Sequence, residues 1–177
     1  MTNASKTTLS EGEVTDRAAR IRLVLTDCDG VLTDAGVYYS ARGEEMKRFN
    51  LRDGMGVERL RNAGIATAIV TREKSEIAMR RADKLKIKAH VGIVDKARSL
   101  PQILAEHGVA TPEVAYIGDD VNDLDVIERI RNEGLCGAPR DAIREIAEKV
   151  HYVSSSAGGH GAFRDFAEWL LRARVHA

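Results

Sequence analysis

The sequence has few cysteines, no excess of charge and no long apolar run, and each absence excludes a class of protein. Two cysteines among 177 residues, Cys28 and Cys136, cannot form the disulfide framework of a small secreted fold. The 27 basic and 27 acidic side chains cancel, so no overall field draws the chain to nucleic acid or to a membrane surface. No apolar stretch reaches the ~18 residues that span a bilayer. We therefore expect a cytoplasmic protein that binds neither nucleic acid nor membrane.

The length of the chain suits one domain with a sizeable core. Residues 1–20 are polar and lack the apolar core of a secretory signal, and we expect them to form a flexible N-terminal segment that is frayed or weakly helical. No internal repeat or linker interrupts the remainder. Residues 21–177 are therefore predicted to form a single domain.

Short apolar runs alternate with amphipathic helical patterns along this domain. The runs predict strands at 23–25, 66–70, 89–91, 114–117, 135–137 and 152–153. The helical patterns cover 54–62, 74–85, 96–107, 123–130, 141–150 and 162–173. Such alternation predicts an α/β fold with a doubly wound, Rossmann-like parallel sheet and right-handed crossovers. Residues 37–39 and 45–49 read as a β-hairpin flap, which is too short to be a cap domain.

The first strand leads directly into a pair of aspartates. The stretch 21–34, IRLVLTDCDGVLTD, places Asp27 and Asp29 immediately after a run typical of a buried strand. Residues two apart on an extended segment point the same way, so both carboxylates can face one spot. Gly30 then lets the backbone turn sharply. Ligands of open α/β sheets bind outside the carboxyl ends of the strands, so this pair is a candidate catalytic centre.

Other strand ends and helix starts supply complementary groups, and the topology should bring them to the same crevice. Thr71 ends the second buried strand, Asp119 and Asp120 follow the fourth, and Lys96 begins a helix. Two carboxylates ~4 Å apart repel by about 4 kcal/mol at an effective dielectric near 20, so a cation is needed. Oxygen ligands favour Mg²⁺. A lysine in the first turn opposes the helix dipole, which indicates that a ligand uses its charge.

Together these groups form a complete set for phosphoryl transfer. Asp27 is predicted to attack phosphorus in line and form an aspartyl-phosphate. Asp29 is predicted to protonate the leaving oxygen and then to activate water as a general base. Thr71 and Lys96 are predicted to hold the equatorial oxygens, while Mg²⁺ neutralises charge between Asp27 and the phosphate.

The four motifs DCDGVLTD, the strand-ending Thr71, Lys96 and GDDVND resemble those of the haloacid dehalogenase-like superfamily of phosphatases, in the same order. The resemblance runs from about residue 22 to the C-terminus. It implies that Asp27 and Asp119 bind Mg²⁺ with their side chains and Asp29 with its carbonyl. It further implies that Asp120 adds a direct or outer ligand and that Asp123 orients the lysine; both also fit the alternative of acids that cap a helix.

A narrower resemblance is carried by the hairpin region 37–57, by the absence of a lid-sized insertion and by GGHGAFRDF at 158–166. These are similar to the capless phosphatases of 3-deoxy-ulosonic acid metabolism. That group acts on 3-deoxy-D-manno-octulosonate 8-phosphate or on nine-carbon nonulosonate 9-phosphates. The resemblance implies a small sugar-acid phosphate as substrate. It also implies a homotetramer in which a neighbour's hairpin and C-terminal tail close the pocket.

Residues 71–85, TREKSEIAMRRADKL, look most like the nine-carbon branch. The resemblance assigns substrate recognition, or support of the catalytic centre, to Glu73, Arg81 and Lys84. Arg72 stands where many members of the group have glycine, so its side chain is a further candidate for contact with the substrate. On a helix as charged as this one, the alternative is a solvated face.

Two other functions compete with a phosphatase. One is a non-catalytic oligomerisation module of the kind fused to sialic-acid cytidylyltransferases, but such modules that have lost activity lack catalytic acids that are all present here. The other is a phosphoacceptor receiver domain, which also combines aspartate, threonine and lysine with Mg²⁺. Receiver domains carry the acidic pair and the phosphoacceptor on different strands, whereas Asp27 and Asp29 share one. The order of the motifs therefore favours the phosphatase.

Overall fold

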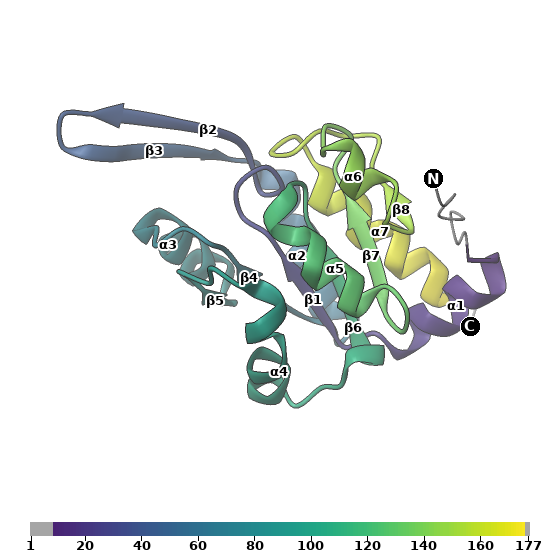
Figure 1. Ribbon diagram of the computed structural model, residues 1–177. Helices are drawn as coiled ribbons and strands as arrows, with labels where there is room; N and C mark the ends of the chain where they lie inside the picture. The colour runs from purple at the N-terminus through teal and green to yellow at the C-terminus, as the bar shows by residue number, and fades with distance from the viewer. Residues whose placement is uncertain (1–8, 176–177) are drawn as a thin grey trace, which may run out of the picture.

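The computed structural model describes residues 9–175 and places a parallel β-sheet at the centre of the molecule (Figure 1). In this part of the chain six strands form the sheet in the order β5-β4-β1-β6-β7-β8, and all neighbouring strands are parallel. The strands are β1 (Leu23–Thr26), β4 (Ala66–Val70), β5 (Lys88–His90), β6 (Val114–Ile117), β7 (Leu135–Ala138) and β8 (Tyr152–Val153). The predicted doubly wound α/β sheet is confirmed.

The chain reverses its direction of travel across the sheet at β1. From β1 it moves outward to β4 and β5, and it then crosses back to β6 on the other side of β1. Thr26 at the end of β1 lies in register with Ile117 at the end of β6. The loops that follow these two strands therefore start side by side, at the kind of switch point where α/β sheets bind ligands.

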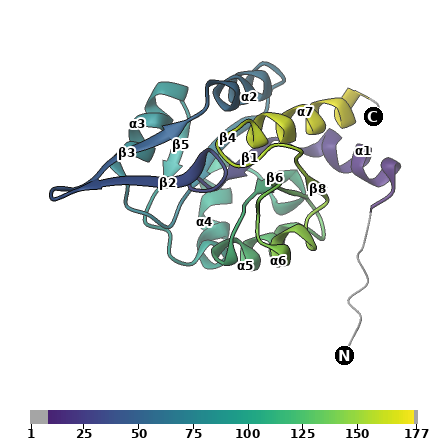
Figure 2. The same ribbon diagram turned by 90° about the horizontal axis from the view of Figure 1, so that it is seen from above.

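Helices cover both faces of the sheet (Figure 2). On one face lie α1 (Glu11–Arg20), α2 (Leu51–Asn62), α3 (Glu76–Leu85) and α7 (Ala162–Val175). On the other lie α4 (Lys96–His107), α5 (Leu124–Ile130) and α6 (Arg144–Ala147), with the short 3₁₀ turns η1 (Thr111–Glu113) and η2 (Val121–Asp123) beside β6. Successive strand side chains alternate between the two cores: Val24 joins the first, and Leu23 and Leu25 join the second.

The hairpin formed by β2 (Thr33–Ser40) and β3 (Gly43–Phe49) projects from the body of the molecule (Figure 1). It is longer than the sequence predicts, and it exposes Tyr38 and Tyr39 near its tip. No domain-sized insertion interrupts the described residues. A flap without a cap domain was expected, and this is what the fold contains.

The N-terminal helix α1 corrects one expectation. Ser10 and Glu13 form a reciprocal capping box at its start, a pattern that is visible in the sequence. Arg17 donates to the carbonyls of Arg131 and Gly134, and Ala18 is buried. For residues 11–20 the helical form of the prediction is observed, and the frayed form is wrong. For residues 1–8 the prediction falls outside the described residues.

The helix expected over 141–150 is also wrong in extent, because α6 has only four residues. Residues before it are used elsewhere: Asp141 accepts a hydrogen bond from the backbone of Gly158, and the amide of Ala142 closes a turn on Pro139. A polar side chain that bonds to a distant loop cannot be read from local periodicity.

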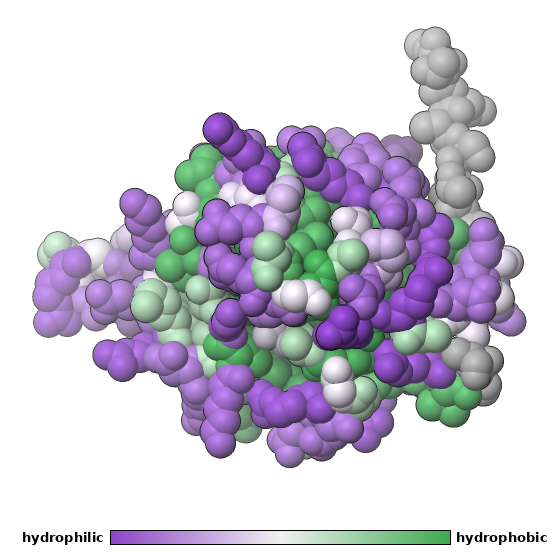
Figure 3. Space-filling view, turned by 90° about the horizontal axis from the view of Figure 1, so that it is seen from below, coloured by the Kyte–Doolittle hydropathy of each residue, from purple (hydrophilic) through white to green (hydrophobic). Residues whose placement is uncertain are grey.

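The surface of the molecule mixes hydrophilic side chains with small apolar areas in the view from below (Figure 3). None of the described helices combines the length and the apolar composition that a membrane crossing requires.

Candidate active site

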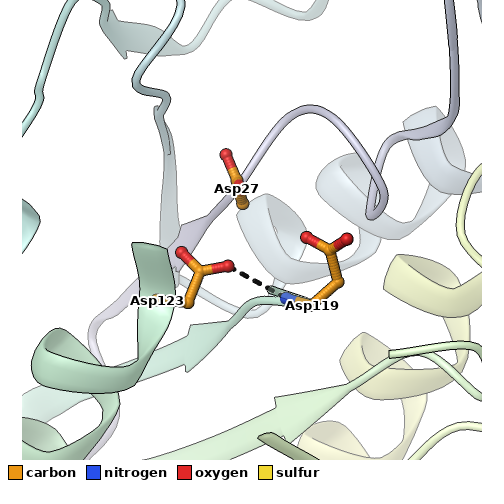
Figure 4. Close-up of side chains that lie close together, drawn as sticks. All are labelled: Asp27, Asp119 and Asp123. Carbon is orange, nitrogen blue, oxygen red and sulfur yellow. Dashed lines mark hydrogen bonds between the residues drawn. The ribbon is translucent and has the colours of Figure 1, made fainter. Parts of the chain in front are cut away.

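Asp27 lies at the centre of the site, directly after β1 (Figure 4). Its side chain is 4% exposed. One carboxylate oxygen accepts the backbone N–H of Cys28 at 2.7 Å, and the other lies 3.1 Å from the ammonium of Lys96. The nucleophile predicted from the sequence is thus held by a loop amide on one side and by a cation on the other.

Asp119 reaches the same spot from the loop after β6. Asp27, Asp119 and Asp123 each offer an oxygen to a cluster in which these atoms lie within 4.8 Å of one another. Gly30 makes room for this approach: a Cβ at its position would lie 1.9 Å from Oδ2 of Asp119. Gly30 also has a φ of +87°, which favours glycine. Its predicted supporting role thus has a steric basis.

Asp123 is occupied by donors from its own surroundings. Its Oδ1 lies 2.6 Å from Nζ of Lys96 and accepts the hydroxyl of Tyr116 at 2.5 Å. Its Oδ2 accepts the amide of Asp119 at 2.9 Å, the bond that is dashed in Figure 4. These contacts indicate that Asp123 fixes the lysine and the loop, as the resemblance implies.

Lys96 is the first residue of α4, and Asp95 caps the helix before it. The lysine side chain is fully buried, and its ammonium donates to Asp123, to Asp27 and, at 3.2 Å, to Tyr116. A cation at a helix N-terminus opposes the dipole, so the carboxylates around it must stabilise it. In this arrangement the lysine holds one carboxylate oxygen of Asp27 and balances part of its charge.

The buried carboxylates of the cluster carry more negative charge than the single ammonium of Lys96 balances. Burial, and then repulsion from Asp27 and Asp123, raises the pKa of Asp119 to about 8. Burial likewise raises the pKa of Asp27, and the Lys96 ammonium opposes that rise. In addition, Oδ1 of Asp119 is buried without a hydrogen-bond donor. An orphaned carboxylate oxygen beside a second carboxylate fits a hard divalent cation such as Mg²⁺.

Comparison with known proteins agrees with this geometry. No family model matches the chain. The 3-deoxy-D-manno-octulosonate 8-phosphate phosphatase of Yersinia pestis is 38% identical over 163 residues, which cover 92% of this chain and 86% of the relative. The chain belongs to the 3-deoxy-D-manno-octulosonate 8-phosphate phosphatase family. It is therefore an enzyme of the phosphoric monoester hydrolase class.

Solved structures place this phosphatase in the haloacid dehalogenase-like superfamily. A superfamily hydrolase from Legionella pneumophila, described as putative subfamily III A, has a TM-score of 0.86 and 33% identity, covering 94% of this chain and 90% of that one. The family member from Moraxella catarrhalis was solved with a magnesium ion, a phosphate ion and a 3-deoxy-D-manno-octulosonate (KDO) molecule. It has a TM-score of 0.85 and 32% identity, with 93% and 94% coverage.

A pocket of about 470 Å³ opens in front of the carboxylates of this phosphatase. All the predicted catalytic and metal-binding residues except Lys96 border it, namely Asp27, Asp29, Thr71, Asp119 and Asp120. The hydroxyl oxygen of Thr71 accepts the amide of Glu73 at 3.2 Å, which leaves its hydrogen free for a ligand. Asp120 caps η2 through its own Oδ1 and is exposed, so both the capping role and an outer-ligand role fit it.

The predicted substrate-binding residues divide into two groups. Arg72 and Glu73 border the pocket. Arg81 instead donates to the carbonyl of Asn50 at 3.0 Å and lies over the ring of Phe49, where it supports the base of the hairpin. Lys84 is exposed further along α3. Within this chain the pocket lining does not include Arg81 or Lys84.

Two residues of the site were missed from the sequence. Tyr116 is buried in β6, where its apolar neighbours favour reading it as core, and its hydroxyl joins Lys96 to Asp123. Lys47 lies in β3, and its ammonium is 2.8 Å from Asp29. Lys47 could have been noticed from the alternation of side chains along a strand, which puts it on the same face of the hairpin as Phe49.

Proposed function

We propose that the protein hydrolyses 3-deoxy-D-manno-octulosonate 8-phosphate in a Mg²⁺-dependent reaction that passes through an aspartyl-phosphate at Asp27. The observation that carries the proposal is Asp27 itself, a buried carboxylate that faces a pocket, is supported by Lys96 and lies next to an orphaned oxygen of Asp119. The family relationship adds the eight-carbon sugar acid.

The cation would be held by the side chains of Asp27 and Asp119 and by the backbone carbonyl of Asp29, with Asp120 beside them. When bound, Mg²⁺ would offset the negative charge of these carboxylates and of the phosphate. The raised pKa of Asp119 supports this part of the proposal, because a nearby cation would restore the ionised form.

In the first step a carboxylate oxygen of Asp27 attacks phosphorus, and the bond from phosphorus to the sugar oxygen breaks. Asp29 gives its proton to that departing oxygen, which leaves as the alcohol. Lys96 keeps Asp27 oriented and opposes its protonation. Thr71 donates its free hydroxyl hydrogen to an oxygen of the phosphoryl group.

In the second step water attacks the phosphorus of the aspartyl-phosphate. Asp29, now ionised, takes a proton from that water as the new bond forms. The bond between phosphorus and the Asp27 oxygen breaks, so inorganic phosphate leaves and the carboxylate of Asp27 is regenerated. Atoms and charges balance with water as the only co-reactant.

An eight-carbon substrate is proposed although residues 71–85 look most like the nine-carbon branch. Their likeness to the nine-carbon branch depends on Glu73, Arg81 and Lys84, but of these only Glu73 borders the pocket of its own chain. The relatives named above carry the eight-carbon name. Arg72 and Glu73 are therefore proposed to contact the sugar acid.

A homotetramer remains part of the proposal. The hairpin projects from the body and exposes 61% of Tyr38 and 72% of Tyr39, large side chains that suit a subunit contact. A neighbour's hairpin and C-terminal tail would then narrow an otherwise open pocket, and Arg81 and Lys84 would act across that contact. Two free, buried cysteines fit the cytoplasm.

The test is phosphate release from a panel containing the octulosonate 8-phosphate, nonulosonate 9-phosphates, hexose phosphates and a phosphopeptide, each with Mg²⁺ and with chelator. We expect kcat/KM to be largest for the octulosonate ester and to vanish with chelator. A preference for a nonulosonate would overturn the substrate, and turnover that survives chelation would overturn the role of the cation. No turnover of any ester by folded protein would favour the non-catalytic module.

A further inference from the structure

The hairpin delivers a buried lysine to the catalytic loop. Nζ of Lys47 lies 2.8 Å from Oδ1 and 2.9 Å from Oδ2 of Asp29, and the lysine side chain is 1% exposed. Asp29 is partly exposed and borders the pocket. One end of this ion pair therefore faces the pocket, and the other is enclosed by protein.

Lys47 is held in place by further contacts within the hairpin and α3. Oε2 of Glu44 lies 3.5 Å from the lysine ammonium, and Oε1 of Glu44 accepts the hydroxyl of Ser75 at 2.8 Å. Ser75 is buried and caps α3. A chain of polar contacts thus runs from the start of α3 through the hairpin to Asp29.

From this geometry we infer that Lys47 is a positioning residue for Asp29 in the proposed reaction, so that the hairpin orients the acid–base group. The inference rests on the proposed function. An acid–base carboxylate must keep its oxygens aimed at the leaving oxygen. An aspartate side chain that nothing restrains rotates about two bonds and would lose this aim. One ammonium holds both oxygens of the ionised group, and when one oxygen carries the proton the other still accepts from the ammonium; such charge-assisted bonds are strong.

A structural role alone would explain the pair differently. In that case Lys47 would serve only to attach the hairpin, yet Arg48 also attaches the hairpin to the body: its guanidinium lies 2.8 Å from Nε2 of His160 and donates to the carbonyl of Gly159 at 3.3 Å. Neither contact involves Asp29. The hairpin therefore has an attachment that does not depend on Lys47. The contact of Lys47 with Asp29 is explained by a need to hold the acid–base group.

The experiment compares two kinds of ester in the Lys47→Met protein. An alkyl phosphate needs its leaving oxygen protonated, whereas nitrophenolate departs from p-nitrophenyl phosphate without a proton. The constant kcat/KM reports the steps through loss of the leaving group. We expect it to fall about 100-fold for the alkyl ester, the range of general acid catalysis, and less than about 3-fold for the aryl ester. Lys47→Arg should recover part of the loss.

The control is Lys149→Met, which removes another lysine–carboxylate pair, the one between the segment after α6 and Glu128 of α5. It should leave both esters unchanged. Equal losses for the two esters in Lys47→Met, or no loss for either, would overturn the inference. If Lys47→Met fails to fold, the same comparison is made with Glu44→Gln, for which a smaller loss confined to the alkyl ester is expected.

The alkyl ester in this comparison is the one that the wild-type enzyme hydrolyses fastest. A wrong substrate assignment would appear as a choice other than the octulosonate 8-phosphate, while the ratio between the esters still tests Lys47. Wild-type protein without activity on either ester would reject both the proposed function and this inference.

Discussion

Two regions of the molecule bury aspartates, and they compensate for the charge in different ways. At the carboxyl edge of the sheet, Asp27, Asp119 and Asp123 converge around Lys96 beside a pocket. Under α7, the single buried carboxylate in the described part of the chain is that of Asp53, which is 1% exposed. Its Oδ1 accepts the amide of Arg164 at 3.0 Å, in the first turn of that helix, and its Oδ2 is buried without a partner.

Burial raises the pKa in both regions, to about 6 for Asp53 and to about 8 for Asp119. At Asp53 a helix N-terminus offsets part of the cost, because its free N–H groups and dipole favour an anion. At the sheet edge several carboxylates compete, and a lysine meets only part of their charge. A buried aspartate with a raised pKa is therefore no evidence of catalysis by itself. The convergence of several such groups on a pocket is what distinguishes the active site.

The largest expected effect is on kcat, when an aspartate is replaced by asparagine in one region and, for comparison, in the other. Asp27→Asn should reduce kcat by about 10⁴-fold or more, because it removes the nucleophile. Asp53→Asn should change kcat little and raise the melting temperature at neutral pH, because it keeps an acceptor for the amide of Arg164 and removes a carboxylate whose ionised form burial disfavours. Steady-state phosphate release and thermal melts of both proteins measure the two effects. Activity that survives in Asp27→Asn would reject the mechanism.

Loss of the lysine should affect both activity and stability. In Lys96→Met the buried Asp123 loses its ion pair and Asp27 its support, and breaking such a pair costs about 3–5 kcal/mol. Denaturant unfolding should show this loss, together with a fall in kcat. A variant as stable as the wild type would show that the lysine does not balance the cluster.

The stability of the protein should carry the titration of Asp53. The unfolded carboxyl group ionises near pH 4 and the folded one at about 6, so between these values the folded state keeps a proton that the unfolded state has lost. Raising the pH from 4 to 6 should therefore weaken folding through this group by about 2 kcal/mol. Unfolding of wild type and Asp53→Asn across this range isolates the contribution. Parallel curves would contradict the shift.

An effect of similar size is expected from the cation. Mg²⁺ at 100 times its dissociation constant should stabilise the folded enzyme by about 2.7 kcal/mol. Asp119→Asn should abolish this increase, whereas Asp53→Asn should retain it. Thermal melts with and without Mg²⁺ provide the measurement, and an undiminished increase in Asp119→Asn would place the cation elsewhere.

Much of the fold could be predicted because its signals are local. The bounds predicted for the strand at 66–70 and the helix at 96–107 coincide with β4 and α4, since each is a continuous pattern ended by a clear terminator such as Gly108. The predicted convergence of Asp27, Asp29, Thr71 and Asp119 on one pocket follows from the order of the strands, and the structure shows it. Their chemical roles stay predictions.

What could not be predicted depends on contacts between distant segments. Lys47 contacts Asp29 because β3 returns the chain to the loop that follows β1. Asp141 lies outside the helix expected for it because its side chain accepts a hydrogen bond from the backbone of Gly158. Tyr116 looks like any buried strand residue until Lys96 and Asp123 are placed beside it. In each case the partner is far away in sequence, and no local periodicity reports it.

The most direct test of the central claim, that Asp27 carries the phosphoryl group, is to trap it. The enzyme is mixed with excess substrate and Mg²⁺, quenched in acid within the first turnover and digested with pepsin at low pH, where an acyl phosphate survives, and the peptide that contains Asp27 is analysed by mass spectrometry. We expect a phosphoryl group on Asp27 that appears before free phosphate and is absent without Mg²⁺. Full turnover with an unmodified peptide at every time, or with the phosphoryl group on another residue, would contradict it.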